Sequence, residues 1–211
     1  HQQPEAHLMM AQLTESEVYH RKDAKMKFLV KISKLRYEST LEQIICSTQR
    51  NLTKETISKR SDCSFIKKSE NILISGATGA GKSYLACAIG HQACSMGYKV
   101  SYFNMNRFYE RISISKLDGT FNKLLNYLQK IELIILDDFG LVPFDNNLRL
   151  ALLQILEDRY GKSSTIIASQ LPIKNWYDYL NDPTMADAIL DRLTAKHHRI
   201  ELKGDSLRKK S

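Results

Sequence analysis

Long apolar runs are absent from this chain of 211 residues, although its hydrophobic fraction of 43% is ordinary for a globular protein. No stretch approaches the roughly 18 consecutive apolar residues that identify a membrane-spanning helix. The first residues also lack the apolar block of a secretory signal peptide. We therefore expect a cytoplasmic protein with no membrane partner.

Cysteine is scarce and is not arranged as a metal site or a redox pair. The four cysteines form no C-x-x-C pair and have no histidines at zinc-ligand spacing. Free thiols in a reducing compartment are the expectation. Cys87 and Cys94 lie seven residues apart in a predicted helix, so both are expected to pack in the core rather than to act as nucleophiles.

Basic residues are missing from the first 20 positions, and the net charge of +8 is unevenly distributed. Residues 21–60 hold 11 basic and four acidic residues, whereas residues 61–191 hold 13 basic and 14 acidic. Residues 192–211 are basic again, with seven against two. A near-neutral core between basic ends predicts a polyanionic partner outside the core, and nucleic acid is the commonest partner of this kind.

The most informative stretch is NILISGATGAGKSYL, which contains the P-loop pattern G-x-x-x-x-G-K-[ST]. Glycines let successive backbone N–H groups converge on a phosphate, and the following helix N-terminus adds positive partial charge. Lys82 is placed to offset phosphate charge, and the Ser83 hydroxyl is placed to ligate Mg²⁺. A glycine turn with an incidental lysine is the alternative. The expected nucleotide-binding residues are Gly76, Ala77, Thr78, Gly79, Ala80, Gly81, Lys82, Ser83 and Tyr84.

A second nucleotide motif is the pair Asp137 and Asp138, which follows a continuous apolar run. An aspartate at the carboxyl end of a buried strand can hold the Mg²⁺ shell, and a second carboxylate can orient the attacking water. We assign these roles to Asp137 and Asp138 in that order, with a helix or turn cap as the alternative for Asp138. Gln170 follows another buried strand and is expected to contact the γ-phosphate or its water, or else to make a plain strand-end hydrogen bond.

Strand and helix patterns alternate over residues 61–211, which predicts an ATPase domain with a parallel sheet and helices on both faces. We expect a three-layer α/β P-loop fold in which the sheet has five strands. The expected strands are residues 72–74, 98–103, 133–136, 165–168 and 199–202.

Residues 1–60 are expected to form a basic helical N-terminal arm. The pattern predicts a helix from residue 21 to about residue 46, in which Phe28, Ile32 and Leu35 pack. A shorter helix is expected over residues 51–60 and a polar linker over 61–69. The arm residues expected to contact DNA phosphates are Lys27, Lys31, Lys34 and Arg36, with a solvated basic face as the alternative.

The chain resembles the IstB-like helper ATPases of insertion-sequence transposition, which are relatives of bacterial replicative helicase loaders within the AAA+ class. The resemblance runs from about residue 34 to residue 210. It depends on five blocks in order, which are GATGAGKSYLACAIG, LIILDDFGL, LEDRYGKSSTIIASQLP, ADAILDRL and LKGDSLRK. It implies an AAA+ fold that uses ATP and Mg²⁺.

The resemblance also implies roles for individual residues. Lys82, Ser83 and Asp137 match the Walker A and Walker B positions of the family. Asp138 stands where many relatives carry glutamate, which is one methylene longer, and Gln170 matches the sensor position.

Two arginines are implied to act on the γ-phosphate. Arg192 resembles the arginine finger given to a neighbouring subunit, and Arg208 resembles the second sensor arginine, which acts within its own subunit. For both, a surface salt bridge or a DNA contact is the alternative.

The expected function is that of an ATP-hydrolysing helper that forms a homo-oligomer on double-stranded DNA and recruits a transposase of the same insertion sequence. A helicase loader is the closest alternative. A nucleotide-gated DNA-binding protein without significant hydrolysis is a second, because Asp138 replaces glutamate. A small-molecule P-loop kinase is less favoured, because no acceptor pocket or arginine-rich lid is evident between Asp138 and Gln170.

Overall fold

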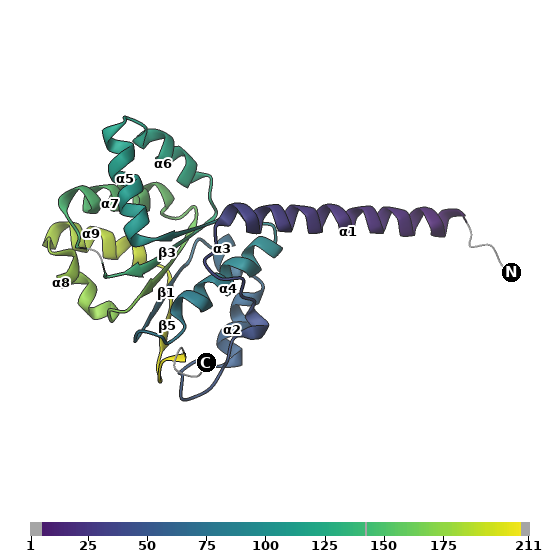
Figure 1. Ribbon diagram of the computed structural model, residues 1–211, viewed down its shortest axis with the longest axis horizontal. Helices are drawn as coiled ribbons and strands as arrows, with labels where there is room; N and C mark the ends of the chain where they lie inside the picture. The colour runs from purple at the N-terminus through teal and green to yellow at the C-terminus, as the bar shows by residue number, and fades with distance from the viewer. Residues whose placement is uncertain (1–5, 142, 208–211) are drawn as a thin grey trace.

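The computed structural model describes residues 6–141 and 143–207 and consists of an α/β body from which one long helix projects (Figure 1). The projecting helix is α1 (Ala6–Ser33), and only its C-terminal end packs against the body, on α4 and β2. Within residues 6–141 and 143–207, no helix has the length and apolar character needed to cross a membrane.

The centre of the body is a sheet of five strands in the order β2-β3-β4-β1-β5, and every neighbouring pair is parallel. The predicted five-stranded parallel sheet is thus confirmed. Its carboxyl ends all lie at one edge, where loops follow the strands. The strands are β1 (Asn71–Gly76), β2 (Val100–Asn104), β3 (Leu133–Phe139), β4 (Ser164–Ser169) and β5 (His197–Leu202).

Helices cover both faces of the sheet, which gives the predicted three layers (Figure 1). Side chains alternate along β1, so Ile72 and Ile74 face one apolar cluster and Leu73 faces the other. The Ile72 face carries α2 (Lys54–Ser61), α3 (Ser64–Lys67) and α4 (Lys82–Ser95). The Leu73 face carries α5 (Met105–Leu117), α6 (Phe121–Gln129), α7 (Asn146–Arg159), α8 (Trp176–Leu180) and α9 (Pro183–Thr194).

The prediction that Cys87 and Cys94 pack in the core is confirmed. Cys87 and Cys94 are fully buried on α4. Burial raises the pKa of each thiol to about 11, so both remain protonated and unreactive at neutral pH.

The prediction for the N-terminal helix is wrong, both in the bounds of the helix and in the residues that pack. It begins at Ala6 and ends at Ser33 rather than near residue 46, and Lys34 takes a left-handed φ of 56°. The predicted packing residues Phe28 and Ile32 are 60% and 38% exposed, whereas Leu29 is 4% exposed. The side chains of residues 9–22 of α1 are exposed, so apolar spacing alone could not identify the short face that packs.

The segment expected to be a polar linker is also different. It contains the single-turn helix α3, in which Phe65 and Ile66 are buried. Leu41 and Leu52, which lie between α1 and α2, are buried in the same apolar cluster. The part of the chain from residue 29 to residue 60 therefore packs on the body.

Arg159, the last residue of α7, is buried without a carboxylate partner among the described residues. Its guanidinium donates to the carbonyl oxygens of Leu128, Ile131 and Ser164 at 2.7, 2.6 and 2.7 Å. Burial lowers its pKa to about 9. The side chain therefore fixes the end of α6 to the start of β4, because carbonyls at a helix C-terminus have no partner within the helix.

We expect Arg159→Met to lower the free energy of unfolding by about 3 kcal/mol, because three carbonyl oxygens lose a buried, charged donor. Urea unfolding followed by circular dichroism measures this change. Arg199→Met is the matched control, since Arg199 is about half exposed and faces Glu201 at 3.7 Å. Its expected effect is within about 0.5 kcal/mol. Equal effects of the two substitutions would contradict the assignment.

Gly76, the last residue of β1, has no room for a side chain. A Cβ there would lie 2.5 Å from the backbone oxygen of Leu202 on the neighbouring strand. We expect Gly76→Ala to lower the free energy of unfolding by about 2 kcal/mol. Thermal unfolding followed by circular dichroism would show this as a lower melting temperature. Gly161→Ala is the control, because it also has a positive φ but meets nothing within 4 Å. A Gly76→Ala protein no less stable than the control would refute the close contact.

Candidate nucleotide-binding site

The P-loop connects the carboxyl end of β1 to the start of α4. Gly79 and Gly81 have left-handed φ values of 82° and 88°, which few residues other than glycine adopt readily. Gly81 is the N-cap of α4, so the unpaired N–H groups of the first helical turn face the loop. Backbone N–H groups and the helix terminus together suit a phosphate group.

Residues distant in sequence meet around this loop. The Ser83 hydroxyl donates to Asp137 Oδ1 at 2.9 Å, and the Thr78 hydroxyl donates to Gln170 Oε1 at 2.7 Å. Lys82 is buried and its ammonium donates to the Ala77 carbonyl at 2.9 Å. The ends of β3 and β4 therefore deliver the predicted carboxylate and amide to the P-loop.

Asp137 is fully buried and is held by several donors. Besides Ser83, its Oδ1 accepts from the backbone N–H of Asp138 at 2.9 Å, and its Oδ2 accepts from the Tyr102 hydroxyl at 2.5 Å. Burial and the neighbouring Asp137 raise the pKa of Tyr102, which keeps the phenol protonated as a donor. A hydroxyl and a carboxylate so placed are the hard oxygen ligands that Mg²⁺ takes, so the residues present fit this ion.

Asp138 has a left-handed φ of 61°, which is unusual for a residue other than glycine. The pairing of β3 with β4 shifts register between Leu136 and Phe139, around this residue. Asn104 donates to Asp138 Oδ2 at 2.6 Å. Burial, then repulsion from Asp137, raises the pKa of the Asp138 carboxyl. Strained backbone of this kind is typical of functional sites.

A cavity of about 580 Å³ lies over the P-loop and has the size of a small-molecule site. Asp138 and Gln170 line it together with the P-loop. The remaining wall comes from the segment between α1 and α2, which contributes Arg36, Tyr37, Gln43, Ile44, Ile45, Arg50 and Leu52. Phosphate-binding groups and a partly apolar wall in one cavity fit a nucleotide.

Sequence reasoning missed several residues of this site. Tyr102 and Asn104 lie on β2, and the pairing of β2 with β3 brings them to Asp137 and Asp138, the acid pair. The Arg50 guanidinium donates to the carbonyls of Ala80, at 2.8 Å, and Ile45. None of these residues belongs to a recognisable motif, and only the order of the strands brings them to the site.

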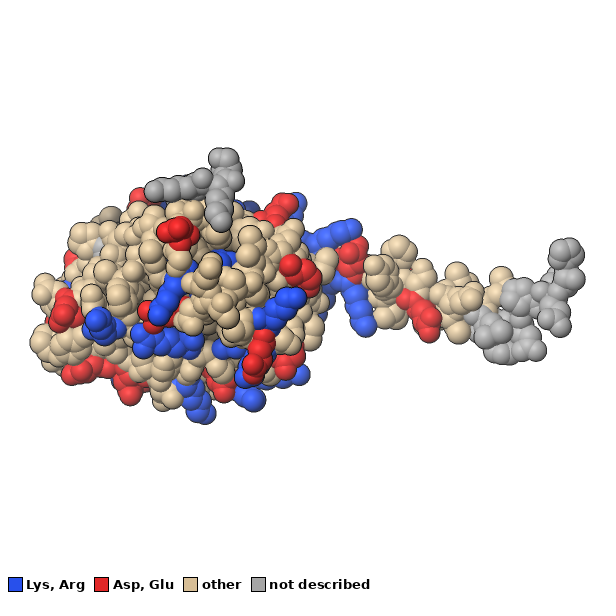
Figure 2. Space-filling view, turned by 90° about the horizontal axis from the view of Figure 1, so that it is seen from below, with Lys and Arg blue, Asp and Glu red and all other residues tan. Residues whose placement is uncertain are grey.

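The arm residues predicted to contact DNA lie in two different surroundings. Lys27, Lys31 and Lys34 are exposed, and Lys27 is paired with Asp23 at 2.8 Å. Arg36 instead faces the acid pair in the cavity. Figure 2 shows the Lys and Arg side chains of the projecting helix at the end next to the body.

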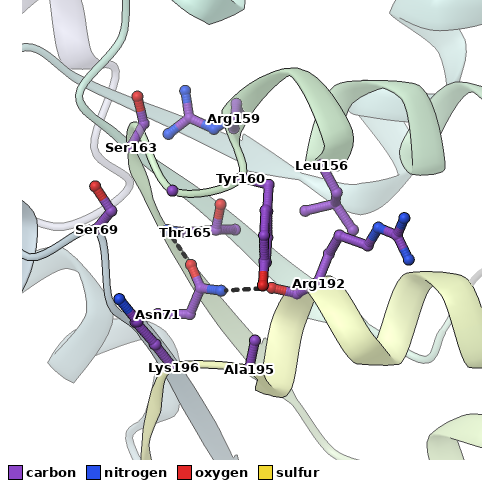
Figure 3. Close-up of a pocket in the computed structure, with 11 residues that line it drawn as sticks. Ser69, Asn71, Leu156, Arg159, Tyr160, Ser163, Thr165, Arg192, Ala195 and Lys196 are labelled. Carbon is purple, nitrogen blue, oxygen red and sulfur yellow. Dashed lines mark hydrogen bonds between the residues drawn. The ribbon is translucent and has the colours of Figure 1, made fainter.

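Arg192 lies at the other edge of the sheet, beside a small pocket (Figure 3). Its Nε donates to Glu157 Oε2 at 2.7 Å, and its carbonyl accepts from Asn71 Nδ2 at 3.1 Å. Asn71 begins β1 and Gly76 ends it, so a strand of ~17 Å separates Arg192 from its own P-loop. Arg208 lies outside the described residues. The preceding N–H, of Leu207, donates to the Gly79 carbonyl at 3.0 Å.

Comparison with known families matches residues 3–211 to the IstB-like ATP-binding proteins. The chain belongs to this family. A putative insertion sequence ATP-binding protein of Sinorhizobium fredii is 41% identical over 197 residues, which cover 93% of this chain and 80% of the relative. The putative ATP-binding protein of insertion sequence IS1162 from Pseudomonas fluorescens is 39% identical over 161 residues, which cover 76% of this chain and 70% of the relative.

Two solved structures share the α/β fold of this IstB-like chain. The DnaC helicase loader has a TM-score of 0.65 at 16% identity, with 81% of this chain and 99% of that chain covered. AMPPCP-bound DnaA from Aquifex aeolicus has a TM-score of 0.66 at 21% identity, with 82% of this chain covered. The IstB-like chain spans about half of the DnaA chain, 52%. At these identities the likeness concerns the fold alone.

Proposed function

We propose that this IstB-like protein hydrolyses ATP while assembled on double-stranded DNA and thereby assists a transposase of the same insertion sequence. The observation that carries the proposal is the meeting of Ser83, Asp137, Asp138 and Gln170 around one P-loop. Its family and the names of its relatives support ATP binding in the setting of an insertion sequence.

The hydrolysis site divides its tasks among residues of this chain. Lys82 and the N–H groups at the start of α4 hold the phosphates, while Ser83 and Asp137 would hold Mg²⁺. Bound Mg²⁺ neutralises phosphate charge. Asp138 accepts a proton from, or orients, the attacking water, and Gln170 fixes that water or a γ-phosphate oxygen. Asn104 occupies Asp138 Oδ2, so the water binds at the other carboxylate oxygen or after Asn104 has moved away.

The proposed assembly of several copies depends on Arg192. It lies at the sheet edge opposite its own cavity, so its guanidinium can complete only the site of another copy. Head-to-tail contacts of this kind generate rings or filaments. The second sensor role of Arg208 remains part of the proposal.

DNA binding is assigned to the basic end of α1, where Lys27, Lys31 and Lys34 are exposed. Each lysine that contacts a phosphate releases counterions, so affinity for duplex DNA is expected to fall steeply with added salt. The proposed division of the chain is a basic arm, residues 1–60, followed by an ATPase domain, residues 61–211.

The proposal is tested by ATP turnover with and without duplex DNA, combined with electron microscopy of the protein with ATP and DNA. We expect Mg²⁺-dependent turnover that DNA stimulates, and ordered rings or filaments with Arg192 at the contact. Absence of both ATP-dependent DNA binding and oligomers would refute it. Pull-down with the transposase and with a replicative helicase separates the transposition helper from a helicase loader.

One observation favours a nucleotide-gated DNA-binding protein with little hydrolysis. The short side chain of Asp138 is engaged by Asn104 and lies 3.5 Å from Arg36, rather than projecting freely into the cavity. Turnover that is measurable and is lost in Asp138→Asn excludes this second function.

A further inference from the structure

Arg36 lies in the nucleotide cavity although it belongs to the segment that follows the projecting helix. Its Nη1 is 3.5 Å from Asp138 Oδ2 and 3.9 Å from Asp137 Oδ2. It lines the cavity together with the P-loop. The proposed hydrolysis mechanism uses both carboxylates but gives no task to this cation.

The contact engages one of the two carboxylate oxygens of Asp138, Oδ2. Asp138 Oδ2 already accepts from the neutral amide of Asn104 at 2.6 Å, so the guanidinium adds a charged partner to the same atom. A carboxylate oxygen that faces a guanidinium and an amide is a weaker acceptor for a third donor, because both partners stabilise its negative charge. In this arrangement Oδ2 is a poor acceptor for the attacking water, and its two partners also fix the direction of the carboxylate.

Arg36 is positioned by its neighbours. Its guanidinium lies 5.3 Å from the centre of the Tyr37 ring, and Tyr37 contacts Tyr84 on α4 with ring centres 5.9 Å apart. The Ser39 hydroxyl donates to the Tyr84 carbonyl at 3.0 Å. The side chain of Arg36 itself is 42% exposed, so it can leave the acids for another anion.

The same residue is closely linked to α1. Leu29 and Ser33, in the last turns of α1, are buried against the body, and Leu35 lies against α4 at Gly90. Only Lys34 and Leu35 separate the end of α1 from Arg36. A change in the direction of α1 therefore shifts the backbone that carries Arg36.

We propose that Arg36 is a positioning residue that restrains hydrolysis until the arm binds DNA. Without DNA, Arg36 holds the Asp138 carboxylate away from water. Duplex DNA bound along Lys27, Lys31 and Lys34 presents phosphates to Arg36 and draws the guanidinium from the acid pair. This inference rests on the proposed function, because it needs both hydrolysis and DNA binding by the arm.

Arg36→Gln tests the restraint in the full chain. We expect ATP turnover without DNA to rise about three- to tenfold, since a half-exposed ion pair has a modest effect. Turnover with saturating duplex DNA is expected to stay within about twofold of the parent, so the stimulation by DNA largely disappears. Arg36→Lys, which keeps the charge, is expected to restore most of the restraint, and KM for ATP is expected to change less than kcat.

Arg21→Gln is the matched control, because Arg21 is an exposed arginine of α1 that pairs with Glu17 at 2.7 Å and lies outside the cavity. Its DNA-free turnover is expected to equal that of the parent. Lower turnover of Arg36→Gln in both conditions would overturn the proposal and make Arg36 a catalytic cation. An equal rise in Arg21→Gln would also overturn it, because general arm charge would then explain the effect.

A separate readout distinguishes failure of this inference from failure of the proposed function. If the parent protein shows no turnover with or without DNA, the hydrolysis proposal fails. The Mg²⁺ concentration needed for half-maximal binding of fluorescent ADP then tests the contact directly. It is expected to fall two- to fivefold in Arg36→Gln, because the guanidinium no longer competes near Asp137. An unchanged concentration would overturn the contact's role.

Discussion

Asp137→Asn is expected to reduce ATP turnover at least about 100-fold, because the substitution removes the carboxylate proposed to hold Mg²⁺. The surroundings make this position intolerant of an amide. Asp137 is fully buried, and its two oxygens accept from the Ser83 hydroxyl, the Tyr102 hydroxyl and the N–H of its neighbour. In the asparagine variant an NH₂ group replaces one oxygen, so at least one of these donors would face another donor. Turnover is measured at saturating ATP and Mg²⁺.

Folding and nucleotide binding must be followed in the same experiment. Binding of ADP without Mg²⁺ is expected to remain within about threefold, since the P-loop itself is unaltered. Asp118→Asn is the control, because Asp118 is exposed, accepts from Thr120 in the turn between α5 and α6, and does not line the nucleotide cavity. An Asp137→Asn protein that folds and hydrolyses at the parent rate would refute the metal role.

Arg192→Ala is expected to lower DNA-stimulated turnover by about 1,000-fold, the effect of losing an arginine that stabilises charge on a γ-phosphate. The prediction is specific to a neighbouring subunit. When Arg192→Ala is mixed in equal amounts with Asp138→Asn, which retains Arg192, roughly a quarter of the sites regain all required groups by random assembly. Turnover of the mixture should therefore far exceed that of either variant alone.

The control for Arg192 is Glu157→Gln, which removes the same ion pair but leaves the guanidinium in place. Its turnover is expected to stay within about threefold of the parent, because an exposed pair contributes little to stability. Absence of recovery in the mixture, with both variants folded and oligomeric, would mean that Arg192 does not act across a subunit contact.

The parallel sheet could be predicted from the sequence because each strand is a short, continuous run of apolar residues. Such a run can be recognised without knowing which strands it pairs with. The ends of α1 could not be predicted in this way, because they depend on which few turns of the helix contact the body. Phe28 fits an apolar stripe as well as Leu29 does, yet only Leu29 meets α4 and the sheet.

The acid pair and the P-loop were recognisable because their chemistry is local in sequence. Tyr102 and Asn104 were not, since their importance comes only from the pairing of β2 with β3. Arg36 shows the opposite difficulty. Its place in a basic stretch predicted a DNA contact, whereas the turn at Lys34 directs it to the carboxylates.

A rotation of the projecting helix about its packed end would displace the chain on the two sides of that point by very different amounts. The 28 residues of α1 span ~42 Å on one side of a fulcrum at Ser33, whereas only Lys34 and Leu35 lie between Ser33 and Arg36 on the other side. A rotation of about 10° at the fulcrum would move the outer end by roughly 7 Å while displacing Arg36 by about 1 Å. A fluorophore near Met10 would therefore report, greatly magnified, a shift that is almost invisible at the catalytic site itself.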